Sequence, residues 1–219
     1  MSAGKIISIS FPMLMQGFGV TIEISIFGII IAIVLGFVIG MLCLSQSTVL
    51  RGIARVYIKI FRCTPFMVQV YLAYFGLPAL GLKIPALRIG ILTLGLYNAA
   101  YIGIILESGI RALPKGQTEA AQAIGLSRSK IFFKILFPQT LSVILPPLTG
   151  QFLQMVKDSS VLSIVTVAEL TMMTQKAVGI TFEPVVVYVL TALLYWGLNL
   201  IIEFVTKRIE RKHRIAQLG

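Results

Sequence analysis

The sequence has little charge, few cysteines and one histidine. Charged residues make up 12% of the 219 residues, about half the share that is typical of soluble domains. Hydrophobic residues make up 57%, and the mean hydropathy is +0.94. A chain of this composition belongs in a lipid bilayer, and its length is enough for one domain.

Several chemical motifs are also missing. Cys43 and Cys63 are too few for a disulfide framework, and we expect both to be reduced packing residues. Neither CxxC nor HExxH occurs, and the lone His213 lies in a basic tail, so we predict no metal site and no catalytic pair. No GxxxxGK[ST] motif is present to bind nucleotide phosphates. We therefore predict that the chain is not an enzyme by itself and that it holds no cofactor of its own.

Five charge-free runs are long enough to cross a membrane as helices, which need about 20 apolar residues. The runs do not alternate as the strands of a membrane barrel do. The predicted fold class is therefore an all-α integral membrane protein with five transmembrane helices, whose termini lie on opposite sides. The runs are residues 24–50, 63–82, 89–106, 135–156 and 184–202.

Basic residues gather after the first, third and fifth runs. Because lysine and arginine are enriched in cytoplasmic loops, we predict an N-terminus outside the membrane and a C-terminus in the cytoplasm. Because the basic residues lie in alternate loops, the net charge of +11 does not indicate a protein that binds nucleic acid. Fourteen of the 19 basic residues follow the pattern: Arg51, Arg55, Lys59, Arg62, Arg111, Lys115, Arg128, Lys130, Lys134, Lys207, Arg208, Arg211, Lys212 and Arg214.

We divide the chain into an outer N-terminal segment (1–18), a transmembrane domain (19–207) and a basic cytoplasmic tail (208–219). Pro12 and Gln16 interrupt the apolar character of the first segment, and we predict no cleavable signal there. Many secondary transporters carry paired repeats, but five spans cannot divide into equal halves. A complete pathway is therefore expected to need a second chain or a partner.

One polar, alanine-rich stretch, residues 117–125, predicts a short helix on the cytoplasmic side. Thr118 is a good N-cap, because its hydroxyl accepts a backbone N–H of the first turn, and Glu119 places negative charge beside the positive helix end. Gly125 is typical of the residue that ends a helix. The alanines between them combine high helix propensity with little bulk: Ala120, Ala121 and Ala123.

The cytoplasmic segment continues to residue 138. Ser127 is expected to cap an amphipathic helix near the membrane surface, and Pro138 to mark the entry into the fourth span. A helix with a small face fits a groove on another protein. On composition alone, an ordinary helical loop is the better-supported alternative, since short motifs often occur by chance.

Polar groups inside the membrane are costly and are therefore functional candidates. Asn98 lies about 16 Å along the third span from Leu87, close to the bilayer centre. A contact with substrate and an interhelical hydrogen bond explain the presence of this polar side chain equally well. Glu107, nearer the cytoplasmic end, is expected either to reach the membrane interface or to pair with Arg111, one helical turn away.

A second polar interruption follows the fourth span. Lys157 and Asp158 break a long apolar tract, and residues 159–173 are too apolar for an exposed loop, so we predict a broken helix that re-enters the protein. Asp158 or Ser159 would cap its second piece, whose N-terminus attracts a carboxylate while Asp158 attracts an amino group. This pair suits a zwitterionic amino acid. The Asp158 carboxylate favours cationic amino acids, but only weakly, because Lys157 partly neutralises it. The predicted substrate-binding residues are Asn98, Gln154, Asp158, Ser160 and Ser163.

Four stretches resemble the permeases of ABC importers, in particular the branch that transports polar amino acids. Glu119-Ala120-Ala121, with Gly125, Ile135 and Pro138 at the spacing that follows, is similar to the EAA signature of that family. The resemblance extends over roughly residues 17–207. The other stretches are residues 61–69, 109–117 and 157–163.

The resemblance implies a type I importer fold in a prokaryotic inner membrane. It implies two permease chains, two cytoplasmic ATPase subunits that bind ATP and Mg, and an outer substrate-binding protein. It also implies that residues 118–125 form the helix that couples the permease to the ATPases. The chain has Cys63 where the family usually has glycine. It has Ile104 and Glu107 where the family often has an acid and an arginine, so no role of that pair carries over.

The leading prediction is therefore the permease subunit of an ATP-driven importer of polar amino acids, including basic ones. We expect a homodimer, because every candidate site residue lies in this chain, although a sister chain fits as well. An ATP-independent channel or carrier subunit is the first alternative. A membrane scaffold that recruits a soluble protein through residues 117–125 is the second.

Overall fold

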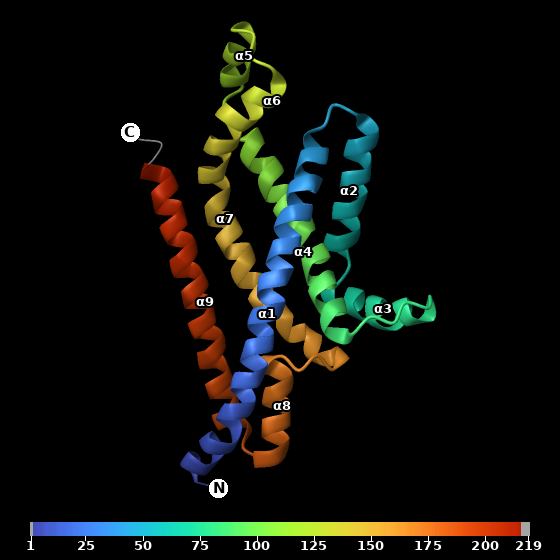
Figure 1. Cartoon of the computed structure of the whole chain (residues 1–219), viewed down its shortest axis with the longest axis vertical. Helices are drawn as coiled ribbons and strands as arrows, with labels where there is room; N and C mark the ends of the chain where they lie inside the picture. Colours follow the sequence, from blue (N-terminus) through green and yellow to red (C-terminus); the bar gives the residue numbers. More distant parts are fainter. Residues whose placement is uncertain (1, 216–219) are drawn as a thin grey trace.

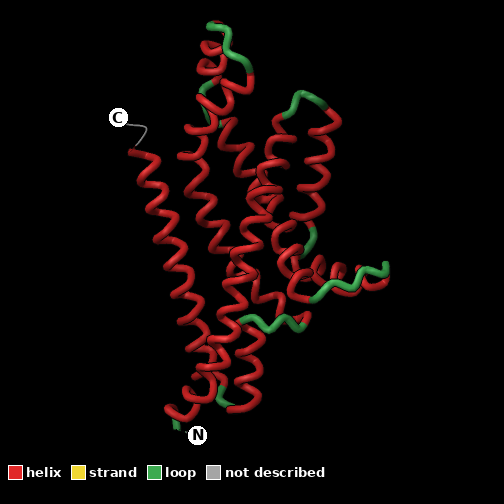
Figure 2. The backbone as a smooth tube through the Cα atoms, viewed as in Figure 1, coloured by secondary structure: helices red, strands yellow, loops and turns green. Residues whose placement is uncertain are grey.

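The structure, a computed structural model, describes residues 2–215, and no strand occurs among them (Figures 1 and 2). Four of its helices are long and apolar enough to cross a membrane, or five if the bent pair α2–α3 counts as one span. The two termini lie at opposite ends of the molecule (Figure 1). The elements are α1 (Ala3–Leu44), α2 (Thr48–Cys63), α3 (Phe66–Ala79), α4 (Ala86–Arg111), α5 (Lys115–Ala123), α6 (Arg128–Ile131), the π-helical turn η1 (Phe132–Leu136), α7 (Phe137–Asp158), the 3-10 helix η2 (Ser159–Val165), α8 (Leu170–Thr181) and α9 (Pro184–Ile215).

Helices α1 and α4 pack closely because small residues line their contact. A Cβ atom added at Gly36 would lie 2.7 Å from the Cβ atom of Ile102, and one added at Gly95 would lie 2.5 Å from a methyl group of Ile31. Small residues at every fourth position are the usual way for membrane helices to approach. They are Gly28, Ala32, Gly36 and Gly40 on α1, and Gly95, Ala99 and Gly103 on α4.

The second predicted span is not one straight helix. Helix α2 returns along α1 as far as Cys63, and α3 then turns away by 101°, so that α3 projects sideways from the bundle (Figure 1). Pro65 causes the break, because a residue that precedes proline is confined to extended backbone, as Thr64 is here. The basic residues predicted for a cytoplasmic loop therefore lie on a helix, and Arg62 is about 21 Å along it from Thr48.

The fourth span begins earlier than predicted. Helix α6, η1 and α7 follow one another directly, and residues 128–165 pass as one candidate span. Residues 127–136 therefore do not form a separate helix on the membrane surface. Ser127 holds the N-cap position of α6 without a side-chain hydrogen bond, and Pro138 lies in the first turn of α7, directly after the π-helical turn η1.

The N-terminal residues also belong to a long helix. Residues 3–18, predicted as part of a separate outer segment, form the first part of α1, with Pro12 inside the helix. Ile6 and Leu14 of α1 pack with Leu170 of α8 and Val187 of α9 in a second apolar core. The fifth predicted span lies within α9, which continues through residues 208–215 of the predicted tail.

Candidate functional site

Helix α5 extends beyond the ends of α4 and α7 at one end of the bundle (Figure 1). It begins at Lys115, directly after Pro114. Thr118 therefore lies in the first turn and is not the N-cap that we predicted. The fixed φ angle of proline suits a helix start, and the helix begins four residues earlier than the Thr118 hydroxyl indicated.

The end of α5 is as predicted. Gly125 adopts a φ angle of +77°, a conformation that glycine adopts without a steric penalty. Its N–H donates to the carbonyl oxygen of Gln122 at 2.9 Å, and the N–H of Leu126 donates to that of Ala121 at 3.1 Å. This pair of bonds is the Schellman motif, which turns the chain sharply at Gly125.

The predicted coupling residues do not all face the same way. Glu119, Ala120, Ala123 and Gly125 are exposed, Thr118 is half-buried, and Ala121 is buried. Ile124, which our prediction left out, is 76% exposed. The sequence did offer a signal for this residue, because an apolar side chain directly before the glycine that ends the helix lies next to the alanine face.

A hydrogen-bonded link joins α5 to the span that follows it. The Gln117 Nε2 atom donates to the Oε1 atom of Gln139 on α7 at 2.9 Å. Gln139 in turn donates through Nε2 to the carbonyl oxygen of Ile135, in the π-helical turn, at 2.9 Å. These two hydrogen bonds connect α5 to the start of α7 at a π-helical turn, a turn type that is often found at functional sites.

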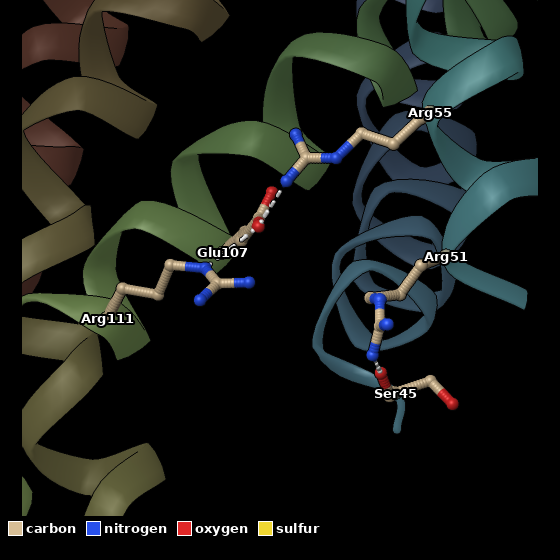
Figure 3. A network of polar contacts seen from close by, with 5 residues as sticks. All are labelled: Ser45, Arg51, Arg55, Glu107 and Arg111. Carbon is tan, nitrogen blue, oxygen red and sulfur yellow. Dashed lines mark hydrogen bonds and ion pairs between the residues drawn. The ribbon is translucent and has the colours of Figure 1, made fainter. Parts of the chain in front are cut away.

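A network of charged residues crosses from α2 to α4 near the same end (Figure 3). The Glu107 carboxylate accepts from Arg55 Nη2 at 2.7 Å and from Arg111 Nε at 2.9 Å. The pairing with Arg111 was predicted, whereas Arg55 was missed because its segment was expected to be a loop. Arg51 closes the α1–α2 turn by donating to the carbonyl oxygen of Ser45 at 2.8 Å.

Asn98 lies inside the bundle with both ends of its amide in use. Its Nδ2 atom donates to the carbonyl oxygen of Leu94 at 2.9 Å, and its Oδ1 atom accepts from Gln151 of α7 at 2.6 Å. The interhelical hydrogen bond that we gave as one explanation is therefore present. The side chain is fully buried, so Asn98 presents no free polar surface in this conformation.

The other four predicted site residues lie together where α7 passes into η2. Gln154 donates to Asp158 at 2.8 Å. The hydroxyl groups of Ser160 and Ser163 donate to backbone carbonyl oxygens three residues earlier, at 2.7 and 2.8 Å. The Asp158 carboxylate and the lone pairs of the hydroxyl oxygens are thus the acceptors available to a ligand.

The helix break does not lie where the sequence indicated. Asp158 and Ser159 keep right-handed helical backbone angles, and α7 runs on into η2 without a side-chain cap. The chain breaks only at Thr166, whose φ angle is +62°, after η2 has buried Leu162 and Val165 in the core. A buried, irregular segment is therefore present, but no helix N-terminus lies free beside Asp158.

The next helix N-terminus is occupied by the chain itself. Glu169 caps α8, where its carboxylate accepts from the N–H groups of Thr171 and Met172 at 2.9 and 2.8 Å. It also accepts from the Tyr195 hydroxyl of α9 at 3.0 Å. Burial raises the pKa of the Glu169 carboxyl above its ordinary value, and these hydrogen bonds act in the opposite direction. Sequence reasoning missed this residue.

Aromatic side chains of α4 lie beside an exposed arginine near the end of α2. The Arg62 guanidinium lies 5.2 Å from the centre of the Tyr101 ring. The hydroxyl groups of Tyr101 and Tyr97 are 3.0 Å apart, and the Tyr97 ring lies 4.9 Å from that of Phe66. Tyr97 packs in the apolar cluster that also holds Phe152 of α7 and Leu162 of η2.

Spanning helices and a short helix beyond one end of the bundle are the features expected of a membrane transport permease. Residues 28–215 match the family described as the binding-protein-dependent transport system inner membrane component, and the chain belongs to this family. It is accordingly a subunit of a bacterial inner-membrane transport system.

Relatives cover nearly the whole chain. It is 34% identical over 204 residues to the probable amino-acid ABC transporter permease protein YckA of Bacillus subtilis (strain 168), covering 93% of this chain and 90% of the relative. It is 31% identical to the arginine transport system permease protein ArtQ of the same organism, covering 92% of each chain. It is also 31% identical to the glutamine transport system permease protein GlnP of Escherichia coli (strain K12), covering 93% of this chain and 94% of that one.

Solved structures share the fold. A chain from the crystal structure of an amino acid ABC transporter with histidines superposes with a TM-score of 0.85 at 29% identity, covering 92% of this chain and 94% of that one. A chain of the inward-facing MetNI methionine ABC transporter superposes with a TM-score of 0.79 at 23% identity, covering 92% and 96%. The second likeness supports the fold alone. The type I importer fold predicted from the sequence is thus confirmed.

Proposed function

We propose that the chain is the permease subunit of an ATP-driven importer of polar amino acids, including basic ones. The observation that carries this proposal is the match of nearly the whole chain to permeases whose names specify amino acids, arginine and glutamine among them. The half-buried Asp158 at the end of α7 gives the basic preference its physical basis, because a carboxylate that forms no ion pair among the described residues attracts ammonium and guanidinium groups.

The partners follow from what this chain lacks. Two cytoplasmic ABC ATPase subunits hold ATP and Mg, a second copy of the permease completes the pathway, and an outer substrate-binding protein delivers the amino acid. Helix α5 lies in the cytoplasm as the coupling helix, and the N-terminus lies outside. The exposed face of α5 formed by Glu119, Ala120, Ala123 and Ile124 contacts the ATPase.

Transport then proceeds by alternating access. ATP binding closes the ATPases and draws the two α5 helices together. The Gln117–Gln139 bond passes this movement to α7, whose far end carries Asp158. Asp158 and Gln154 bind the amino group, with the hydroxyl groups of Ser160 and Ser163 beside them, and Asn98 supports α7 through Gln151.

Uptake into proteoliposomes tests the proposal against its alternatives. Labelled arginine and glutamine are supplied with the binding protein, with and without the ATPase subunits and internal ATP. Uptake only when both are present supports the importer. Uptake without ATP indicates a channel or carrier, and no uptake under any condition indicates a scaffold.

Gly125→Val tests the coupling role of α5. Valine is strained at a positive φ angle, by about 1–2 kcal/mol, so the turn after α5 should be distorted and ATP-driven uptake should fall by at least about tenfold. Glu119→Lys should reduce uptake through the exposed face instead. Gly116→Ala is the matched control, since Gly116 lies in α5 with open space around it and no positive φ. Loss of membrane insertion in Gly125→Val would assign this segment to folding rather than coupling.

A further inference from the structure

Arg62 lies far from either end of the bundle. It is about 21 Å along α2 from Thr48, and its partner Tyr101 is about 15 Å along α4 from Arg111 and about 20 Å from Arg88. The contact between the Arg62 guanidinium and the Tyr101 ring places the guanidinium at the same height in the bundle as Tyr101. A hydrocarbon core is about 30 Å thick, so the Arg62 guanidinium is placed well inside the membrane.

Arg62 is exposed, and no carboxylate pairs with it in the part of the chain that the structure describes. An unpaired arginine at this depth is not stable against lipid. Such side chains face a bundle interior or a water-filled cavity and mark substrate pathways. The exposed side of α2 at Arg62 is therefore expected to line the aqueous pathway.

The surroundings of Arg62 place both signs of charge near one another. Its guanidinium covers the Tyr101 ring, and the Tyr101 hydroxyl contacts the Tyr97 hydroxyl. Tyr97 packs in one apolar cluster with Phe152 of α7 and Leu162 of η2, which precede and follow Asp158 in the sequence. A cation and an anion thus flank a pair of phenol groups. An amino acid has the same pattern, with a carboxylate and an ammonium group on one carbon atom.

The chain offers a substrate carboxylate few other places. The helix N-terminus expected beside Asp158 does not exist, because α7 continues into η2. The N-terminus of α8 is filled by Glu169. Arg62 retains free donors in a planar group that binds carboxylates in a bidentate manner.

We propose that Arg62 binds the α-carboxylate of the transported amino acid while Asp158 takes its amino group. The proposal rests on the amino acid import proposed above and assigns a recognition role to a residue outside the predicted site. It implies that the pathway recognises the backbone of an amino acid at two points, so that substrates without a carboxylate are rejected.

The two cysteines of the chain test whether Arg62 faces water. Cys63 is adjacent to Arg62 and exposed, whereas Cys43 is buried. In the full-length permease with its ATPase subunits in membrane vesicles, a charged, membrane-impermeant thiol reagent should label Cys63 from at least one side and leave Cys43 unlabelled. Labelling of Cys63 only by a lipophilic maleimide would place Arg62 against lipid and overturn the proposal.

Ligand discrimination tests the role itself. Binding of L-arginine and of agmatine, its decarboxylated amine, is measured on the purified permease–ATPase complex without the binding protein. Arg62→Gln should weaken arginine binding about 10- to 100-fold, the range for a lost hydrogen bond to a charged group. Agmatine binding should change little, and Arg62→Lys should recover part of the loss. Lys59→Gln, which removes a nearby charge from the same helix, is the matched control.

The outcomes separate this inference from the proposed function. Equal weakening of arginine and agmatine, or no change in either, would overturn the role of Arg62 while ATP-driven uptake by the wild type still supports the importer. Failure of the wild type to import any amino acid would overturn both. An unchanged labelling pattern at Cys43 in Arg62→Gln shows that the variant is folded.

Discussion

Arg55 and Arg62 lie on the same face of α2, two helical turns apart, and have different surroundings. Arg55 meets the buried Glu107 carboxylate on α4 at 2.7 Å. Arg62 lies over the ring of Tyr101, also on α4, and pairs with no carboxylate among the described residues. The two arginines are the same residue type on the same pair of helices. What α4 places opposite each one therefore decides whether it holds the bundle together or stays available to a ligand.

The Glu107 site is built for assembly. Its carboxylate is almost fully buried and meets two guanidinium groups whose side chains are 51% and 58% exposed. Because the arginines keep contact with water, the site avoids most of the desolvation cost of a fully buried ion pair. At the Arg62 site the guanidinium has no carboxylate partner among the described residues, so an ion pair does not add to stability there.

The largest effect on stability is expected for Glu107→Ala. This change removes the carboxylate that joins α2 to α4 and leaves two guanidinium groups facing each other. Loss of a partner in a buried pair costs about 3–5 kcal/mol. Since both arginines can turn to water, we expect about 2 kcal/mol here. The measurement is the free energy of unfolding of the full-length protein in mixed micelles.

Arg62→Ala in the same assay sharpens the contrast. A cation–π contact at an exposed site is worth about 0.5–1 kcal/mol, so this variant should unfold almost as the wild type does while its ligand binding fails. A loss of stability as large as that of Glu107→Ala would make Arg62 a structural residue and remove the difference between the two arginines.

Single removal of either partner of Glu107 should have a smaller effect. Arg55→Ala and Arg111→Ala each leave one guanidinium on the carboxylate, and partly exposed pairs contribute about 0.5–1 kcal/mol. The double variant should cost more than the sum of the two, because only then does the buried carboxylate lose every cation. Strict additivity in this double-mutant cycle would mean that the two arginines do not share Glu107.

These two sites also mark the limits of the sequence analysis. Charge-free runs located the helices that stay straight, and the glycine signal placed the end of α5 at Gly125, because both depend on local chemistry. Both arginines were assigned to a loop, since counting uncharged residues assumes that a span is continuous. The 101° turn after Cys63 makes a charged helix part of the bundle instead.

The missed residues share a second cause. Glu169, Gln151 and Tyr101 each act through a partner more than 25 residues away in sequence. No local pattern in a single sequence reports such a pairing. Gln154 and Asp158 were found because their contact spans one helical turn, which spacing alone can show.

Glu169 extends the comparison to a buried carboxylate that forms no ion pair within residues 2–215. It accepts from backbone N–H and hydroxyl groups, and burial is the largest influence on its raised pKa. The native protein therefore binds this proton more tightly than the unfolded chain does. By linkage, its contribution to stability is complete below the ordinary pKa of glutamate and is lost as the pH rises through the raised native value.

Glu169→Gln should remove this pH dependence, which we expect to be the smallest of the predicted effects on stability. The glutamine amide stays neutral at every pH, so the thermal midpoint of the variant should fall less than that of the wild type as the pH rises from about 4 to 8. Glu183→Gln, in the turn between α8 and α9, is the control and should keep the slope of the wild type. If Glu169→Gln kept that slope too, burial of Glu169 would not set its titration. The different hydrogen-bond partners of Glu107 and Glu169 would then not lead to different effects on stability.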